Sequence, residues 1–382
     1  MDWGSDRTRR RRRPGPAALA ALALALAATA AACTPPPPNP GGPGTTTTTR
    51  PAPPTTVAPS TTTRPAPSTT VAPTTTTTTR PAPPTTTAPD PDPAPDFPGA
   101  VPAGSLRWGA AIDGNGNPVP RHEDPSGQPL ALRRTFWRWD QRLGGMLNVI
   151  RDDLAHDRLP WVSLKPGGSW HDMGSGAFDA QIDELLRALD AVDGPVWLTI
   201  HHEPEGGGGV NAPDDPGGAP EWRNMQRRFR ERMDAVGVDN VAFAPILMTW
   251  TWDTRSGRNP DDWWVPGIWD FYGVDHYTEE QGTLVLPVWQ KVRRWVGDRG
   301  LPVAVGEWGM RGSDAAAGDR VRAWFDHAAG SATDGQGAQV IALSAFDSDL
   351  NSSTGGWSLE GGQLTAFQQL LGDRRTLDAS EP

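Results

Sequence analysis

From residue 99 onward, short apolar segments alternate with segments whose apolar residues recur at helical spacing. Because parallel strands need crossover connections, this alternation indicates a parallel sheet whose strands are joined by helices. Eight strands with interleaved helices in about 270 residues predict a (β/α)8 TIM barrel, which is an α/β fold. The segments expected to form these strands are residues 107–113, 130–139, 159–165, 196–202, 241–248, 270–275, 301–305 and 339–345.

A doubly wound open sheet is the structural alternative, because it also alternates strands with helices. Its nucleotide-binding versions carry a glycine-rich phosphate loop directly after an early strand. No Gly-x-Gly-x-x-Gly or Walker-type loop follows the early strands of this sequence. We therefore favour the closed barrel.

The N-terminal residues 1–33 have the pattern of an export signal. The basic block Arg7 to Arg13 precedes an Ala/Leu run, Ala17 to Ala32, that is too short to span a bilayer comfortably. The run ends at Cys33, which is the single cysteine, so no intrachain disulfide can form. The segment resembles a bacterial lipobox with Ala30 in place of the usual Leu, which predicts lipidation of Cys33. Ordinary signal-peptidase cleavage at the same bond is the alternative, and both place the protein outside the cell or on its envelope.

Residues 34–98 are almost wholly Pro, Thr, Ala and Gly, with a loose repeat that begins at Arg50, Arg64 and Arg80. Such a segment has too few large apolar side chains to offset the entropy of ordering. We predict a disordered Pro/Thr-rich linker, extended by its prolines, that holds the domain 99–382 away from an envelope surface.

The domain that follows the linker is acidic. It holds 26 of the 35 Lys and Arg residues and 40 of the 45 Asp and Glu residues, which gives a net charge of about −14. A domain of this charge is a poor candidate for binding nucleic acid or an anionic membrane. We expect a monomer without a cofactor, attached to a membrane only through the lipid on Cys33.

Two of the expected strands end in a glutamate. Glu203 follows the apolar run at 196–200, and Glu307 follows the run at 301–305. In a (β/α)8 barrel, catalytic residues come from the C-terminal ends of the strands, and strands four and seven lie on opposite arcs of the ring. Two facing carboxyls are what a glycosidase requires. They lie about 5–5.5 Å apart in retaining enzymes and about 6.5–9.5 Å apart in inverting ones.

The arrangement of one glutamate after strand four and another after strand seven resembles that of the large clan of retaining glycosidases built on (β/α)8 barrels. Most of that clan has Asn before the first glutamate, whereas this chain has His202. The His202-Glu203 pair, the Gly-Glu-Trp-Gly segment at 306–309 and the Asp-His-Tyr strand end at 275–277 are similar to glycoside hydrolase family 26. That family comprises β-mannanases, some β-1,3-xylanases and mixed-linkage β-glucanases. The resemblance extends over roughly residues 105 to 370.

The resemblance implies a retaining endo-β-glycosidase that acts on a β-linked polysaccharide, most plausibly β-mannan. Glu203 would be the acid/base and Glu307 the nucleophile. His202 would contact sugar or orient Glu203, and Tyr277 would hydrogen-bond the nucleophile and keep it ionised. Tryptophans beyond strands five and seven suit sugar stacking, although a tryptophan taken singly is more often part of the core than a sugar platform. The further residues predicted to bind substrate are Asp275, His276, Trp250, Trp252, Trp264 and Trp308.

Two departures from the family pattern fall on sugar subsites. A Pro-Glu-Gly4 segment at 204–209 replaces the usual Gly and Trp-rich continuation, and Phe346-Asp347 stands where a Trp platform is usual on strand eight. Glu205 is a rival acid, but its place two residues further out favours a loop carboxylate.

Three other interpretations remain. His201, His202 and Glu203 could contribute to a metal site, but no His-Glu-x-x-His spacing and no further cysteine support it. A barrel enzyme of another reaction class, such as a metal-dependent hydrolase, is the second. The third is a non-catalytic carbohydrate- or wall-binding lipoprotein on a degenerate barrel, which would tolerate loss of either glutamate.

Overall fold

The computed structural model describes residues 96–206, 218–279, 282–349 and 355–381. The predicted export signal, Cys33 and nearly all of the linker lie outside these residues. The strands are β1 Arg107–Ile112, β2 Leu132–Trp137, β3 Leu159–Leu164, β4 Val196–Ile200, β5 Val241–Phe243, β6 Ile246–Met248, β7 Tyr272–Thr278, β8 Val303–Met310 and β9 Val340–Asp347. The helices are α1 Asp124–Ser126, α2 Gly145–Leu154, α3 Trp170–Ser175, α4 Asp179–Asp190, α5 Gly218–Val236, α6 Pro287–Gly297, α7 Ala315–Gly330 and α8 Gly361–Leu371.

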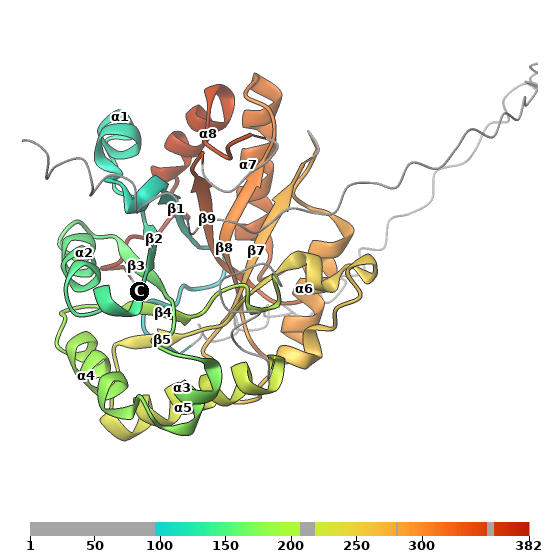
Figure 1. The fold of residues 1–382 in the computed structure, drawn as a ribbon. Helices are drawn as coiled ribbons and strands as arrows, with labels where there is room; N and C mark the ends of the chain where they lie inside the picture. The colour runs from blue at the N-terminus through green and yellow to red at the C-terminus, as the bar shows by residue number, and fades with distance from the viewer. Residues whose placement is uncertain (1–95, 207–217, 280–281, 350–354, 382) are drawn as a thin grey trace, which may run out of the picture. The chain divides into compact units, whose positions relative to one another are not determined.

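All strands are parallel, and their order in the sheet is β5-β4-β3-β2-β1-β9-β8-β7-β6. The first and last strands of the chain, β1 and β9, therefore lie side by side, as the teal and red ribbons of Figure 1 show. Neighbours in the sheet follow the order of the chain. A doubly wound sheet would reverse this order at a switch point, so that alternative is wrong.

The barrel closes at β5 and β6, which are two halves of one interrupted strand. Only Ala244 and Pro245 separate them, and Pro245 has no N–H to donate to a ladder. The first half pairs with β4 and the second half with β7. The nine strands therefore make eight barrel positions, and the predicted (β/α)8 fold is confirmed. The single strand predicted at 241–248 is broken at its proline.

Apolar side chains fill two regions. The larger lies between the strands and the surrounding helices, and includes Trp108 and Trp308. The second is a separate cluster that includes Trp161, Trp197 and Phe271, whose rings contact one another. Trp161 and Trp197 come from early positions of β3 and β4, so this cluster fills the barrel below the strand ends. The polar residues described below lie further along the same strands.

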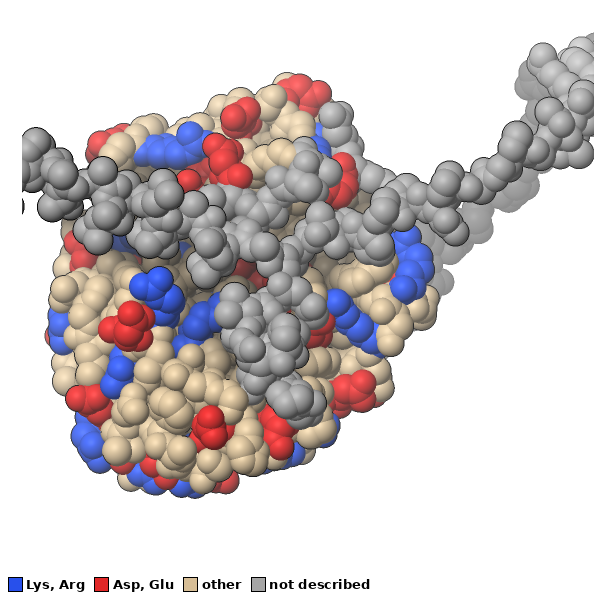
Figure 2. Space-filling view, in the orientation of Figure 1, with Lys and Arg blue, Asp and Glu red and all other residues tan. Residues whose placement is uncertain are grey.

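Charge is distributed without a dominant sign on the face shown in Figure 2, where basic and acidic side chains of the described residues are interspersed. Within the described ranges, no helix is long and apolar enough to cross a membrane.

Candidate active site

Glu307 lies inside β8 rather than beyond its end, and a β-bulge determines where its side chain points. Val305 is paired with Val274 of β7, but the next pair is Glu307 with Asp275, so Gly306 is an extra residue. Strict alternation would turn Glu307 outward with Val305, which packs in the outer core. The extra residue shifts the alternation and directs Glu307 into the barrel.

Glycine at this bulge leaves room for two neighbouring side chains. A Cβ on Gly306 would lie 2.8 Å from Oδ1 of Asp275 and 3.0 Å from Cδ1 of Ile246. Both distances are shorter than ordinary packing allows. Steric crowding therefore explains the glycine before Glu307, and the apolar pattern of the strand alone did not reveal this.

Two donors hold the Glu307 carboxylate. Nη2 of Arg134 lies 3.2 Å from Oε1, and the Tyr277 hydroxyl donates to Oε2 at 2.7 Å. Arg134 is itself fixed, because its Nη1 donates to Oγ of Ser163 at 2.9 Å. Burial, and then the charge of Glu307, raises the pKa of Tyr277 well above its usual value, so the hydroxyl stays protonated and donates. The Glu307 side chain is 7% exposed. Charge-assisted bonds to both of its oxygens restrict it to one orientation.

Asp275 lies beside Glu307 on the neighbouring strand and is 2% exposed. Burial, and then the charge of Glu307, raises its pKa well above the usual range, although Arg134 acts in the opposite direction. Neither of its carboxyl oxygens accepts a hydrogen bond from the described residues. Asp275 therefore lies buried against Glu307 with a raised pKa, and its contact with substrate stays a prediction.

Glu203 lies in the turn that follows β4. The backbones of His201 and Glu203 are left-handed, with φ of 55° and 49°. This conformation costs about 1–2 kcal/mol for a residue with a Cβ, so contacts must hold the turn. The N–H of Glu203 donates to the Ile246 carbonyl at 2.8 Å, and the Trp170 indole donates to Nδ1 of His201 at 2.5 Å. The first glutamate of the predicted pair thus lies on a strained but anchored turn.

Glu203 and Glu307 belong to one electrostatic neighbourhood. Burial lowers the pKa of Lys165, at the end of β3, and the charges of both glutamates oppose this shift. Burial raises the pKa of Tyr277, and the charges of Glu307, Asp275 and Glu203 raise it further. Coulomb interactions weaken with distance, so both carboxylates lie close to the same two side chains.

His202 is half-buried at the same end of the barrel, where its ring centroid lies 5.4 Å from that of Phe136. Burial, and then the nearby charges of Lys165 and Arg134, lowers the pKa of His202 well below its usual value. A neutral imidazole can both donate and accept a hydrogen bond, which suits contact with a sugar hydroxyl.

Glu205 is not an exposed loop carboxylate. It lies in the short helix η5, Pro204–Gly206, and is 6% exposed. Its Oε1 accepts hydrogen bonds from the Met248 main-chain N–H at 2.6 Å and from the Thr251 hydroxyl at 2.9 Å. Burial raises its pKa to about 7. The rival acid of the sequence is therefore attached to the barrel wall.

Trp308 and His276 face away from the site, and their predicted contacts with substrate are wrong. Because of the bulge, Trp308 points outward, is 1% exposed and stacks on Trp108 with centroids 5.6 Å apart. His276 also points outward, with its ring nitrogens 3.0 Å from the Thr249 hydroxyl and 2.7 Å from the Leu284 carbonyl. Both side chains belong to the packing between the sheet and its helices.

The remaining predicted tryptophans divide into two groups. Trp252 is buried and packs against Trp295 with centroids 5.3 Å apart, so its prediction as a sugar platform is wrong. Trp264 is half-buried and also packs against Trp295, with centroids 5.6 Å apart. Trp250 is half-buried, and the Arg255 guanidinium lies 5.1 Å from its ring centroid. For Trp250 and Trp264, contact with sugar stays a prediction.

Sequence reasoning missed an aromatic group beside Glu307. Phe136, Phe346 and Tyr277 pack with Trp357, which follows β9, in a small separate cluster. Trp357 lies 4.8 Å from Tyr277 between ring centroids and carries the Arg311 guanidinium 3.6 Å from its ring. The sequence signal for this aromatic group was Phe346, which stands where a Trp was expected on strand eight.

Arg134 and Lys165 were missed as well. Their signal was a charged residue inside or at the end of an apolar strand segment. The polar residues of β2 include Arg134, which is the partner of Glu307. A charge placed in a buried strand is costly unless it is paired, so it marks an inward-facing polar site.

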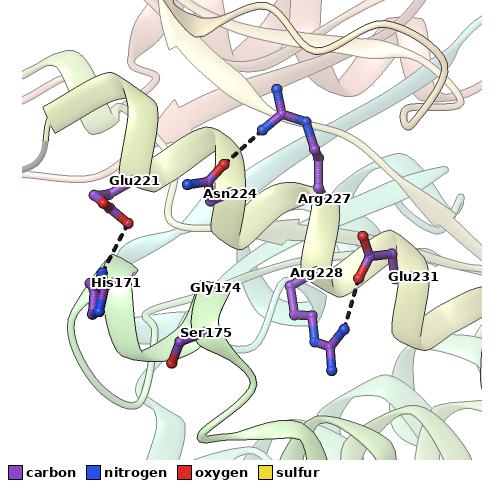
Figure 3. Close-up of a pocket in the computed structure, with 8 residues that line it drawn as sticks. All are labelled: His171, Gly174, Ser175, Glu221, Asn224, Arg227, Arg228 and Glu231. Atoms are coloured by element: carbon purple, nitrogen blue, oxygen red, sulfur yellow. Dashed lines mark hydrogen bonds and ion pairs between the residues drawn. The ribbon is translucent and has the colours of Figure 1, made fainter.

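The structure records a shallow depression of about 330 Å³ between α3 and α5 (Figure 3). Its charged side chains are paired with each other, as in His171 with Glu221 at 3.3 Å and Arg228 with Glu231 at 2.8 Å. None of the residues around Glu307 lines it. Across the described ranges, no group of three or more His, Cys, Asp or Glu side chains could hold a metal ion.

No protein-family model and no curated protein matches the sequence. Solved structures do match. A modular endo-β-1,4-mannanase of glycoside hydrolase family 26 from Cellulomonas fimi is 17% identical, with 73% of each chain covered and a TM-score of 0.50. The mannanase man26 of Bacillus subtilis is 13% identical, with 73% of this chain and 88% of that chain covered and a TM-score of 0.50. At these identities the likeness concerns the fold alone, which is the (β/α)8 barrel described above.

Proposed function

We propose that this chain is a retaining β-glycosidase with Glu307 as the nucleophile and Glu203 as the acid/base. The observation that carries the proposal is the Glu307 carboxylate, aimed into the barrel by a bulge and held by Arg134 and Tyr277. Lys165 and Tyr277 interact electrostatically with both glutamates, which supports their acting on one substrate.

The reaction has two displacements. In the first, the Glu307 carboxylate attacks the anomeric carbon, the bond to the leaving sugar breaks, and Glu203 gives its proton to the leaving oxygen. In the second, Glu203 removes a proton from water, and the water oxygen displaces Glu307 from the same carbon. Arg134 and Tyr277 orient the nucleophile throughout, and neutral His202 is placed to contact a sugar hydroxyl.

We propose β-mannan as the substrate, attacked within the chain, because the similar structures are endo-mannanases. The altered segment after Glu203 and the replacement of the strand-eight Trp by Phe346 keep β-1,3-xylan and mixed-linkage β-glucan as the other substrates to test. We also propose export with lipidation at Cys33, which labelling with a fatty acid and mass analysis of the mature N-terminus would test.

The deciding experiment exposes the full chain to a 2-deoxy-2-fluoro-β-mannoside with a good leaving group, followed by peptide mass analysis. We expect one covalent adduct on the peptide that contains Glu307, together with hydrolysis of β-mannan that chelators do not inhibit. A chain that binds β-glycans but forms no adduct and releases no sugar would instead be a non-catalytic carbohydrate-binding protein.

A further inference from the structure

The turn after β4 is joined to β6 in an unusual way. β4 pairs with β5 only as far as Leu198 and Phe243. Beyond that point, the Glu203 N–H donates to the Ile246 carbonyl at 2.8 Å, and the Met248 N–H donates to Glu205 Oε1 at 2.6 Å. We call these four residues, Glu203, Glu205, Ile246 and Met248, the β4–β6 seam.

In this seam a side chain takes the place of a main-chain carbonyl. In a parallel ladder, the carbonyl of one residue and the N–H of the residue two further on bond to the same neighbouring strand. The Ile246 carbonyl and the Met248 N–H are such a pair, but the chain has already left strand geometry at His201. The Glu205 carboxylate reaches back to accept the second bond. This bond joins the turn to β6 at the point where the barrel closes.

Glu205 is built into the wall rather than directed at a substrate. Its Oε1 also accepts a hydrogen bond from the Thr251 hydroxyl at 2.9 Å, so both donors belong to the segment that runs from β6 into the short helix Thr249–Trp252. Its Oε2 is buried and accepts no hydrogen bond from the described residues. The neighbouring charge of Arg258 favours the ionised form of Glu205, and Glu205 in turn raises the pKa of buried Tyr272.

The seam restrains the backbone of Glu203. Glu203 has a left-handed backbone, which a residue with a Cβ keeps only when its surroundings impose it. Its own N–H is fixed to Ile246, and Glu205, two residues later, is fixed to Met248 and Thr251. Rotation of the turn is therefore restrained on both sides of Glu203.

We propose that Glu205 is a positioning residue that aims the Glu203 carboxyl by completing the β4–β6 seam. The inference rests on the proposed function, because Glu203 must be the acid/base for its direction to matter. Glu205 acts through the turn and does not touch the substrate.

The test compares Glu205→Ala and Glu205→Gln with the wild-type full chain. For each protein, kcat/KM is measured on β-mannan, whose leaving sugar must be protonated, and on a dinitrophenyl β-mannoside, whose leaving group needs no proton. Misplacing a catalytic group by about 1 Å can cost about 10²-fold. We therefore expect Glu205→Ala to lower kcat/KM on mannan by about 10- to 100-fold and on the activated substrate by less than about threefold. Glu205→Gln keeps an oxygen for Met248 and should recover most of the difference.

Two further variants keep the result decisive. Asp153→Asn is the matched control, because Asp153 is also a buried carboxyl with a raised pKa but lies in α2 between Arg133 and Arg158. It should lower both activities equally, through stability alone. Thr251→Ala removes one donor to the same oxygen and keeps the carboxylate, so it tests the seam even if Glu205→Ala does not fold. For this variant we expect kcat/KM to fall about threefold more on mannan than on the activated substrate.

The outcomes separate the two proposals. Equal losses on both substrates for the Glu205 and Thr251 variants, in an active wild-type enzyme, overturn the positioning role and leave the glycosidase assignment intact. A wild-type chain that neither forms the fluoroglycoside adduct nor hydrolyses any β-glycan overturns the glycosidase assignment, and the positioning role with it. A mannan-selective loss that Gln recovers supports both.

Discussion

Glu307 lies within a strand and its carboxylate is held by Arg134 and Tyr277, whereas Glu203 lies in a strained turn and its main-chain N–H donates to the Ile246 carbonyl. The difference matches the work proposed for each. A nucleophile must present an ionised oxygen in one direction throughout the cycle, and fixed donors favour that state. An acid/base must hold and release a proton in turn, so both of its charge states must be accessible. The hydrogen bond from the Glu203 N–H to the Ile246 carbonyl restrains the backbone in both states.

The largest effect should follow removal of the strand-held carboxylate. Glu307→Ala deletes the atom that forms the covalent intermediate, and we expect kcat/KM to fall by about 10³-fold or more on every substrate. Glu307→Gln keeps the shape of the side chain and should lose as much. Unchanged circular dichroism would show that the fold persists. Retention of more than about a hundredth of the wild-type activity by either variant would falsify the nucleophile assignment.

Removal of the turn-held carboxyl should give a loss that depends on the leaving group. Glu203→Ala should lower kcat/KM on β-mannan by about 10²- to 10⁴-fold, the usual range for general acid catalysis. On a dinitrophenyl glycoside the same variant should lose less than about tenfold, because a good leaving group departs without a proton. Added azide should then raise kcat by replacing water in the second displacement. A loss of equal size on both substrates would contradict the acid role.

Much of this barrel could be predicted from local sequence. Parallel strands buried on both faces are continuous apolar runs, so each of the eight runs located a strand. The roles of single side chains depended instead on register. The bulge at Gly306 turns Glu307 inward and Trp308 outward, whereas uninterrupted alternation does the reverse. Because a bulge is defined by the pairing with the neighbouring strand, the pattern of one strand does not reveal it.

The partners of the glutamates were hidden for a related reason. Arg134 and Glu307 are 173 residues apart in the sequence, and they meet only because β2 and β8 face across the barrel interior. Glu205 was assigned to a loop since nothing local shows that its carboxylate completes a ladder with Met248. Closure of the sheet, rather than the propensity of any segment, creates both contacts.

Glu205, in the turn after β4, should also make the stability of the fold depend on pH. Burial raises the pKa of Glu205 from an ordinary 4.5 to about 7, so the folded state favours its protonated form. The stability contributed by this group is therefore complete below about pH 4.5 and is lost as the pH rises to about 7, by about 3 kcal/mol. Glu205→Gln does not titrate and should lack this loss in denaturant titrations between pH 4.5 and 8.

Asp153 provides the control for this measurement. Burial raises its pKa to about 6, so its own contribution is lost at lower pH. Asp153→Asn should therefore leave the decline in stability between about pH 6 and 7 in place, while Glu205→Gln removes it. If both variants decline as the wild type does over that interval, Glu205 does not titrate there.

The smallest effect should come from loosening the strand-held carboxylate without removing it. Tyr277→Phe deletes one hydrogen bond to Oε2 of Glu307 and leaves the Arg134 contact and the stacking against Trp357 in place. A bond to a charged group contributes about 1.5–3 kcal/mol, so kcat/KM should fall by about 10- to 100-fold. The loss should be the same on mannan and on the dinitrophenyl glycoside, because both react through Glu307. A mannan-selective loss would instead place Tyr277 with the acid/base, and the different roles assigned to the strand glutamate and the turn glutamate would no longer hold.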